Sequence, residues 1–266
     1  MKPISGSTKE RVPLSRDRVL AGAIAVADAG GIGALTIRLL AQELGVKPMS
    51  VYHYVANKDE IIDGIVDLVY SEIDLPVPGG DWRTEMRRRA NSARRVLAGH
   101  PWATALLQSR LSPGPATLRH HNAFIATLRT AGFSVELTAH AFALIDSYVF
   151  GFALSENALP IHGPDSVADT AASMIQFFDA DAYPHLLEFT MQHVMRPDYD
   201  FGKEFEYGLT LILDALARSI PDNGGRPSGR PGHRVKAGQG TIRKARRLTG
   251  GSDGPLPVSR NSTKSW

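Results

Sequence analysis

A short segment beginning at Pro48 concentrates side chains that can form hydrogen bonds outside the chain. Its apolar positions, spaced as on one side of a helix, are Val51, Tyr54 and Val55. The opposite side of this predicted helix carries Pro48, Met49, Ser50, Tyr52 and His53. A face that only meets solvent more often carries Glu and Lys. Hydroxyl, phenol and imidazole groups instead match the hydrogen-bonding edges of bases, so the segment is predicted to enter the major groove of DNA.

The spacing of apolar residues predicts the helices that hold this segment in place. Three of them are expected to follow the capping residues Ser15, Thr36 and Asn57, whose side chains can bond to free amide groups at a helix start. Gly45 suits the end of the second helix, where a tight turn needs a permissive backbone. The last helix is expected over residues 58–73. Two short helices joined by a turn form a helix-turn-helix, here at about residues 36–55.

Residues from about 14 to 73 resemble the DNA-binding domain of the TetR family. Two stretches carry the resemblance, LTIRLLAQELGV at 35–46 and VYHYVANK at 51–58. The family pattern has a tyrosine at the end of its reading helix, then two more aromatic or histidine positions and a lysine just beyond. The residues at these places are Tyr52, His53, Tyr54 and Lys58. The resemblance implies that double-stranded operator DNA is a partner.

The resemblance also implies roles for individual residues. Those expected to contact base edges are Arg38, Met49, Ser50 and His53, with Pro48 shaping the approach of the helix. Those expected to contact phosphates, which fix the register without reading the sequence, are Thr36, Tyr52 and Lys58. Lys47 can contact either a base edge or a phosphate. Tyr54 is the last of the residues expected to bind DNA. Two alternatives stay open, since Tyr52 can belong to the core and Arg38 can be an ordinary surface charge.

The rest of the chain to residue 220 keeps a helical period, and no stretch alternates as a strand does. The predicted fold class is therefore all-α, with an N-terminal three-helix helix-turn-helix domain and a larger helical bundle. The predicted domains are a flexible basic arm (1–14), the helix-turn-helix domain (15–60), a ligand-binding and dimerisation domain (61–220) and a disordered basic tail (221–266). The helices predicted in the larger domain are 82–100, 103–109, 115–130, 135–156, 165–178, 184–194 and 201–220.

Two shorter stretches resemble the C-terminal domain of the tetracycline-repressor branch, VLAGH at 96–100 and AGFS at 131–134. The resemblance implies a homodimer in which two long helices per subunit pair as a four-helix bundle, here 135–156 and 201–220. That branch holds a drug–magnesium chelate with a histidine on the helix that corresponds to 103–109. This chain has no histidine there, so neither magnesium nor another cofactor is expected.

The aromatic residues of the larger domain allow two interpretations. They can form the core of the bundle or of the dimer, or some of them can line a pocket for an unidentified small-molecule effector that is apolar or aromatic. The residues expected in such a pocket are His100, Trp102, His121, Phe124, Tyr148 and Phe152. Spacing alone does not separate core from pocket wall.

Composition and charge narrow the class of protein. The chain has no cysteine, which excludes disulfides and thiolate metal sites. The most apolar run, 139–154, is shorter than a membrane span, and no signal peptide is visible, so no membrane partner and a cytoplasmic location are expected. Residues 221–266 carry 10 Lys and Arg but 2 Asp and Glu, whereas residues 61–220 carry 12 and 19. A polyanion is therefore expected to bind at the ends of the chain and not at its acidic middle.

The sequence favours a homodimeric repressor that binds a pseudo-palindromic operator and is released by an effector. An activator, or a regulator without a ligand, is the alternative within the same fold. A helical enzyme or a protein-interaction module that contains a helix-turn-helix hairpin is the alternative of another class. No motif for nucleophilic, phosphate-binding or metal-dependent catalysis is found, so the protein is not expected to be an enzyme.

Overall fold

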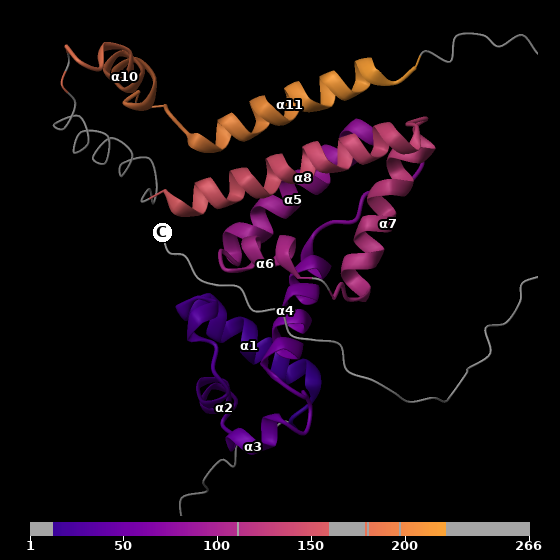
Figure 1. Cartoon of the computed structure of the whole chain (residues 1–266), viewed down its shortest axis with the longest axis vertical. Coiled ribbons are helices and arrows are strands. Elements are labelled where there is room, and N and C mark those ends of the chain that lie inside the picture. The colour runs from indigo at the N-terminus through magenta and orange to yellow at the C-terminus, as the bar shows by residue number, and fades with distance from the viewer. Residues whose placement is uncertain (1–12, 111, 160–178, 180, 197, 222–266) are drawn as a thin grey trace, which may run out of the picture. The chain divides into compact units, whose positions relative to one another are not determined.

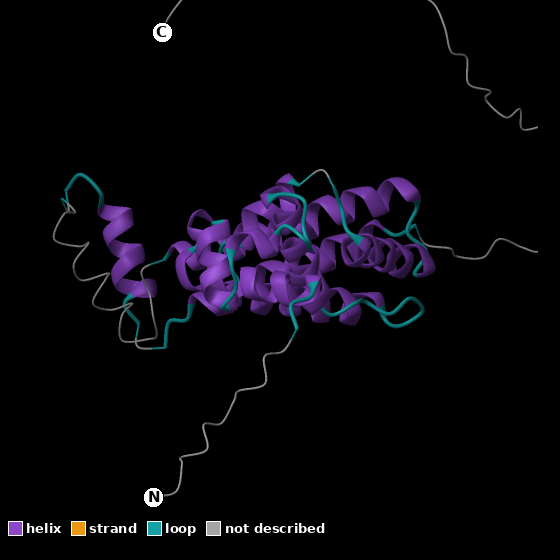
Figure 2. Cartoon of the chain, turned by 90° about the horizontal axis from the view of Figure 1, so that it is seen from below, coloured by secondary structure: helices purple, strands orange, loops and turns teal. Residues whose placement is uncertain are grey.

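The computed structural model describes residues 13–110, 112–159, 179, 181–196 and 198–221. Within these residues all regular structure is helical (Figures 1 and 2). The predicted helix at 165–178 and the predicted tail lie outside the described residues, apart from residue 221. The helices are α1 (Arg16–Gly30), a 3₁₀ turn (Ile32–Ala34), α2 (Ile37–Leu44), α3 (Pro48–Val51), α4 (Lys58–Glu72), α5 (Trp82–Gly99), α6 (Ala103–Ser109), α7 (Pro115–Thr130), α8 (Val135–Ala158), α10 (Pro184–Phe189), a π-helical turn (Thr190–Val194) and α11 (Phe201–Ser219).

The predicted helix caps are confirmed. The Ser15 hydroxyl accepts a hydrogen bond from the Arg18 amide at 3.2 Å, and Thr36 caps α2 in the same way at 3.2 Å. The Asn57 side chain accepts from the amide of Glu60 at 2.8 Å at the start of α4. Gly45 ends α2 with a φ of 67°, the left-handed conformation that favours glycine.

The N-terminal helices enclose a small core. Helix α1 packs against both α2 and α4, and α2 contacts α3. The helices approach closely at Gly64 of α4, where an added Cβ would lie 2.7 Å from the Leu20 side chain of α1. Val51 and Val55 are buried, as predicted. This packing fixes α3 on the outside of a rigid three-helix support.

Two expectations about the third helix are wrong. The helix covers four residues, Pro48–Val51, and continues as a hydrogen-bonded turn through Tyr54, whereas the apolar positions Val51, Tyr54 and Val55 predicted a longer helix. Tyr54 was expected in the core, but 37% of it is exposed. With the helix ending at Val51, position 54 no longer follows the helical period, so Tyr54 is not held in the core.

The larger part of the described chain is built around α5 and α8. Helix α5 contacts α7 and α8, α4 contacts α7, and α8 contacts α11. Fully buried apolar side chains such as Met86, Leu97, Phe124, Ile145 and Leu213 fill the space between these helices. We call α5 to α8 and α11 the helical body, and α4 is the helix that joins it to the N-terminal helices.

Helix α8 is longer than the apolar run within it. Its 24 residues make it, among the described residues, the one helix long and apolar enough to cross a membrane by length and composition alone. The expectation that this segment is too short is therefore wrong, because the helix extends past residues 139–154 at both ends. Its packing against α5, α7 and α11 accounts for part of its apolar character, since 39% of the apolar window is buried in the described structure.

Candidate DNA-binding surface and effector cavities

The residues predicted to read DNA share one short, accessible region around α3. Met49 is 72% exposed, Tyr52 45% and Tyr54 37%, while Ser50 is half-buried. The remaining predicted contacts, all exposed, are Thr36, Arg38, Lys47, Pro48, His53 and Lys58. Within the described part of the chain, the side chains of Arg38, Lys47 and Lys58 form no hydrogen bond or ion pair. These cations are therefore available to an external partner.

Backbone hydrogen bonds hold α3 at a fixed angle to α2. The amide of Val46 donates to the Ala41 carbonyl at 2.9 Å, and the amide of Ser50 donates to the Lys47 carbonyl at 2.9 Å. Arg18 of α1 donates to the carbonyl of Leu44 at 3.1 Å, at the end of α2. The two residues lie 26 positions apart, so no local pattern in the sequence signals this contact.

The start of α4 is fixed in two ways, which sets the place of Lys58. Asn57 caps the helix, and the Glu60 carboxylate accepts a hydrogen bond from the Ala56 amide at 2.7 Å. The pair resembles a capping box, except that the Glu60 carboxylate bonds to the amide of Ala56, the residue before the N-cap. Lys58 is the first residue of α4, next to the reading surface, as a phosphate contact requires.

The six residues predicted to line an effector pocket divide among three places. His100 and Trp102 contact α1 and α4. His121 and Phe124 belong to an aromatic cluster within the body, where the Phe142 ring lies 5.2 Å from the ring of His121 and 4.9 Å from that of Phe124. Tyr148 and Phe152 pack against α11. The structure therefore does not bring the six residues into a single pocket.

His100 and Trp102 link the body to the N-terminal helices. His100 Nδ1 lies 2.7 Å from Asp28 of α1, and its Nε2 lies 3.3 Å from Glu72 of α4. The Trp102 indole donates to the same Asp28 oxygen at 2.6 Å. Burial opposes a charge on His100, but the hydrogen bonds and charges of the two carboxylates outweigh it and raise the pKa of His100 above its ordinary value. We call these four residues the His100 junction.

Tyr148 and Phe152 are used in packing between α8 and α11. The Tyr148 hydroxyl donates to the carbonyls of Glu204 and Phe205, each at 3.0 Å. A Cβ at Gly208 would lie 2.3 Å from that hydroxyl, so the close approach requires glycine there. Phe152 stacks on Phe201 at 4.7 Å. Of the two interpretations of the aromatic residues, packing within the bundle core is the one that fits Tyr148 and Phe152.

Two cavities occur beside His121. The larger, about 440 Å³, lies between α7 and α8 and is mostly apolar, with Ile125, Val135 and Phe142 among its lining residues. The smaller, about 170 Å³, is lined by Tyr70, Arg110 and Thr117, among others. His121 lines both, and its Nε2 lies 3.4 Å from the Tyr70 hydroxyl. Of the six predicted pocket residues, His121 is the one that lines these cavities.

Helix α4 is tied to the body along its length by contacts that the sequence did not reveal. Arg110, after α6, pairs with Asp63 at 2.5 Å. The Asp67 carboxylate accepts hydrogen bonds from the amides of Ala116 and Thr117, at 3.1 and 2.8 Å, and so caps the start of α7. The partners lie 47 to 50 positions apart in sequence, so no local pattern signals them.

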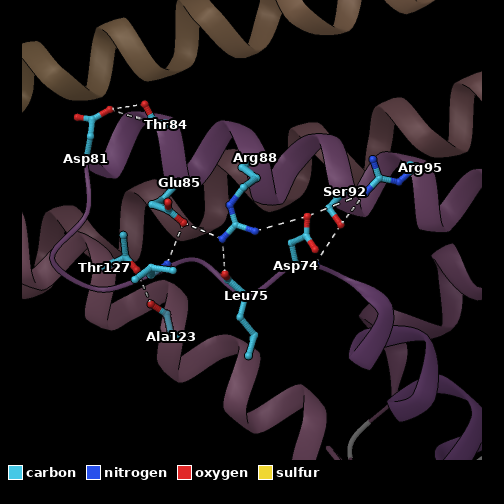
Figure 3. Close-up of polar contacts among 11 residues, drawn as sticks. Asp74, Leu75, Asp81, Thr84, Glu85, Arg88, Ser92, Arg95, Ala123 and Thr127 are labelled. Carbon is cyan, nitrogen blue, oxygen red and sulfur yellow. Dashed lines mark hydrogen bonds and ion pairs between the residues drawn. The ribbon is translucent and has the colours of Figure 1, made fainter.

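The connection from α4 to α5 is also held by side chains (Figure 3). Ser92 accepts a hydrogen bond from the Asp74 amide at 3.0 Å, and the Glu85 carboxylate accepts from the Val77 amide at 2.9 Å. Arg88 donates to the same carboxylate and to the Leu75 carbonyl. Side chains of α5 therefore hold this connection in place.

Comparison with known proteins agrees with this geometry. Residues 19–65 match the family model of the bacterial regulatory proteins of the tetR family. Residues 75–220, more than half of the chain, match the model of the tetracyclin repressor-like C-terminal domain. The HTH-type transcriptional repressor DrrR1 of Streptomyces coeruleorubidus is 30% identical over 216 residues, which cover 76% of this chain and 77% of that protein. An HTH-type transcriptional regulator of Saccharopolyspora erythraea is 32% identical over 174 residues, covering 65% and 73%.

Solved structures show the same arrangement of helices. The TetR family protein ActR of Streptomyces coelicolor, in complex with actinorhodin, is 28% identical and has a TM-score of 0.66, covering 79% of this chain and 99% of that one. The matches extend over both the helix-turn-helix and the helical body, as the resemblance at residues 14–73, 96–100 and 131–134 indicated. The chain therefore belongs to the TetR family and is a DNA-binding transcriptional regulator.

Proposed function

We propose that this regulator is a cytoplasmic homodimeric repressor that binds a pseudo-palindromic operator and leaves it when a small-molecule effector binds. The observation that carries the proposal is the exposed, fixed group of hydrogen-bonding side chains on and beside α3. DrrR1 supports the assignment as a repressor, and the complex of ActR with actinorhodin supports a small-molecule effector. We further propose that residues 15–60 form the DNA-binding domain and residues 61–220 the effector and dimerisation domain, with no enzymatic activity.

The proposed dimer interface lies on the outer faces of α8 and α11. Leu144 and Leu154 of α8 are 52% and 56% exposed, and Tyr207 and Leu211 of α11 are 66% and 53% exposed. Exposed apolar side chains concentrated on two adjacent helices mark a protein interface. A second copy of the chain fits because pairing the two helices with their symmetry mates buries this face on both subunits.

Release from DNA is proposed to act through α4. An effector at the two cavities beside His121 touches α4, α6, α7 and α8 at once, since residues of these helices line them. It changes DNA affinity only if it binds the DNA-bound and released arrangements with different affinity. The Arg110–Asp63 pair and the His100 junction join the body to α4 and α1, so moving α6 or α7 changes the angle of the reading helices.

A gel shift with the DNA flanking the protein's own gene tests operator binding. We expect a specific complex that excess scrambled DNA does not remove, and protection of two half-sites about one helical turn apart. Arg38→Ala should weaken it. Arg119→Ala, which removes the same charge from an exposed position on α7, should not. Protection of one asymmetric half-site, or no specific complex, contradicts the proposal.

Light scattering tests the dimer. Leu211→Glu places a charge on the proposed interface and should yield a monomer that binds DNA weakly. Leu118→Glu is the matched control, because Leu118 is 56% exposed but lies on α7. If Leu211→Glu remains a dimer, or if Leu118→Glu also dissociates, the interface lies elsewhere.

A further inference from the structure

The His100 junction joins three helices through a single imidazole ring. His100 follows α5, and its side chain is 14% exposed. Its Nδ1 lies 2.7 Å from Asp28 near the end of α1, and its Nε2 lies 3.3 Å from Glu72, the last residue of α4. The two nitrogens of one ring therefore face carboxylates that belong to different helices.

This arrangement requires a proton on each ring nitrogen. An ionised carboxylate can only accept hydrogen bonds, whereas a neutral imidazole has one N–H donor and one acceptor. The imidazolium ion donates from both nitrogens, so it is the form of His100 that binds Asp28 and Glu72 at the same time. In the neutral ring, one nitrogen turns a lone pair toward a carboxylate.

The two carboxylates are not held equally well when the second proton leaves. The Trp102 indole donates to the same Asp28 oxygen at 2.6 Å, which keeps that carboxylate in place. The contact with Asp28 is also the shorter one, and the side chain of Glu72 is 48% exposed where that of Asp28 is 32% exposed. The neutral ring therefore keeps its N–H toward Asp28, and the contact with Glu72 breaks.

The charges around His100 set the pH range in which this happens. Among the described residues, the charged groups that act on His100 are Asp28 of α1 and Glu72 of α4, while Trp102, at the start of α6, is neutral. Burial opposes the charge, but the two carboxylates outweigh it and raise the pKa of His100 above its ordinary value of about 6.5. The contact with Glu72 is thus fully present below about pH 6.5 and is lost as the pH rises through the folded pKa.

The other contacts between α4 and the helical body do not depend on a histidine. Asp63 pairs with Arg110, whose guanidinium stays protonated, and Asp67 accepts hydrogen bonds from the backbone amides of Ala116 and Thr117. These contacts hold the middle of α4, whereas Glu72 holds its end. Loss of the His100 proton therefore frees one end of α4 and leaves the rest attached.

We propose that His100 is a pH-sensitive tie on α4, so that operator affinity falls as the imidazolium loses its proton. Operator binding requires two reading helices at a separation that the helical turn of DNA sets. A separation that is held before binding costs less to order than one that must be selected from a wider range. The inference rests on the proposed homodimeric repressor and gives it a second input that needs no ligand.

Operator affinity of the full chain, measured by fluorescence anisotropy at constant ionic strength and several pH values, tests the inference. Glu72→Gln keeps the size of the side chain, and its amide can donate to Nε2 or accept from it, so this contact survives without the imidazolium. The affinity of the wild type relative to Glu72→Gln should fall by about threefold to tenfold as the pH rises above about 6.5, since a half-exposed ion pair has a modest effect. Other titrating groups affect both proteins alike. A constant or rising ratio overturns the inference.

Glu136→Gln is the matched control. Glu136 lies 3.9 Å from His140 within α8, so the same substitution is made in a histidine–glutamate pair whose side chains are 88% and 67% exposed and belong to one helix. The affinity of the wild type relative to this variant should not change with pH. If it falls as it does for Glu72→Gln, the effect comes from a general loss of negative charge, which contradicts the tie.

Proton NMR of the His100 ring in the free protein separates this inference from the proposed function. The ring of the wild type should titrate above about pH 6.5, and its midpoint should be lower in Glu72→Gln. This titration together with a constant affinity ratio overturns the inference and leaves the repressor function intact. Absence of a specific operator complex at every pH contradicts the proposed function and the inference together.

Discussion

The N-terminal helices and the helical body place their polar side chains in opposite ways. On α3 and its neighbours the groups predicted to act, such as Arg38 and His53, face solvent and are supported by an apolar core beneath them. In the body, Arg89, Asp146 and His120 are buried, and the core itself contains the polar groups. We therefore expect recognition on α3 to be separable from stability, and changes at the buried polar groups of the body to affect stability directly.

The largest expected effect comes from breaking the buried pair that Arg89 of α5 forms with Asp146 of α8 at 2.5 Å. Arg89→Met leaves Asp146 buried without its cation, and we expect the free energy of unfolding to fall by about 3–5 kcal/mol. Adding Asp146→Leu should restore most of the loss, because well-packed apolar groups replace a buried pair at little or no cost. Urea denaturation measures both.

Arg38→Met is the matched change on the other region and should alter stability by less than about 0.5 kcal/mol. If it destabilises the protein as much as Arg89→Met, the proposed separation of recognition from stability fails. If the double variant is no more stable than Arg89→Met alone, the fall in the free energy of unfolding comes from altered packing and not from the unpaired charge of Asp146.

His53→Ala should change which DNA is bound. Loss of a base contact is expected to cost about 1–3 kcal/mol on the operator and much less on unrelated DNA, so discrimination falls. Competition binding against operators with single base-pair changes measures the loss at each position. An equal loss on every sequence would make His53 a phosphate contact.

Lys58→Ala should weaken binding to all DNA alike. Removing one phosphate contact lowers the slope of log affinity against log salt by about one unit, with the base preference unchanged. Titrations at several salt concentrations test this, with Lys203→Ala on α11 as a control that removes a lysine from the helical body. An altered base preference in Lys58→Ala would contradict the assigned role.

The smallest effect concerns pH at the His100 junction. The folded-state pKa of His100 is raised, so the protonated junction adds stability that is fully present below the unfolded value of about 6.5 and is lost as pH rises through the folded value. The unfolding midpoint of the wild type should therefore fall relative to that of His100→Gln as the pH rises above about 6.5. If the unfolding midpoints of the two proteins change with pH in parallel, Asp28 and Glu72 do not stabilise the protonated form of His100.

Local patterns predicted the elements far better than the contacts between them. Ser15, Thr36 and Asn57 were identified as caps because a cap involves residues three positions apart. The ends of α3 were harder, because a short helix can continue as a turn, and this changed the environment of Tyr54.

The lining of the cavities was the hardest feature of the helical body to predict from the sequence. An aromatic residue within a bundle has the same local signal whether it packs against α11, as Phe152 does, or lines a cavity, as His121 does. The burial of Arg89 had no signal at all, because α5 reads as an arginine-rich amphipathic helix with Arg89 among several similar residues. Only the positions of α7 and α8 show which arginine is buried.

Asp146 also affects the nascent chain before it folds. It lies at the middle of α8, the helix whose length and composition match a membrane span. An aspartate at the centre of such a segment opposes its partition from the translocon into lipid by about 2.5–3.5 kcal/mol. While the nascent chain still lacks its tertiary contacts, this carboxylate disfavours mistargeting of the segment. A leucine at this position removes the safeguard, so the yield of the double variant depends on how the expression host sorts hydrophobic nascent chains.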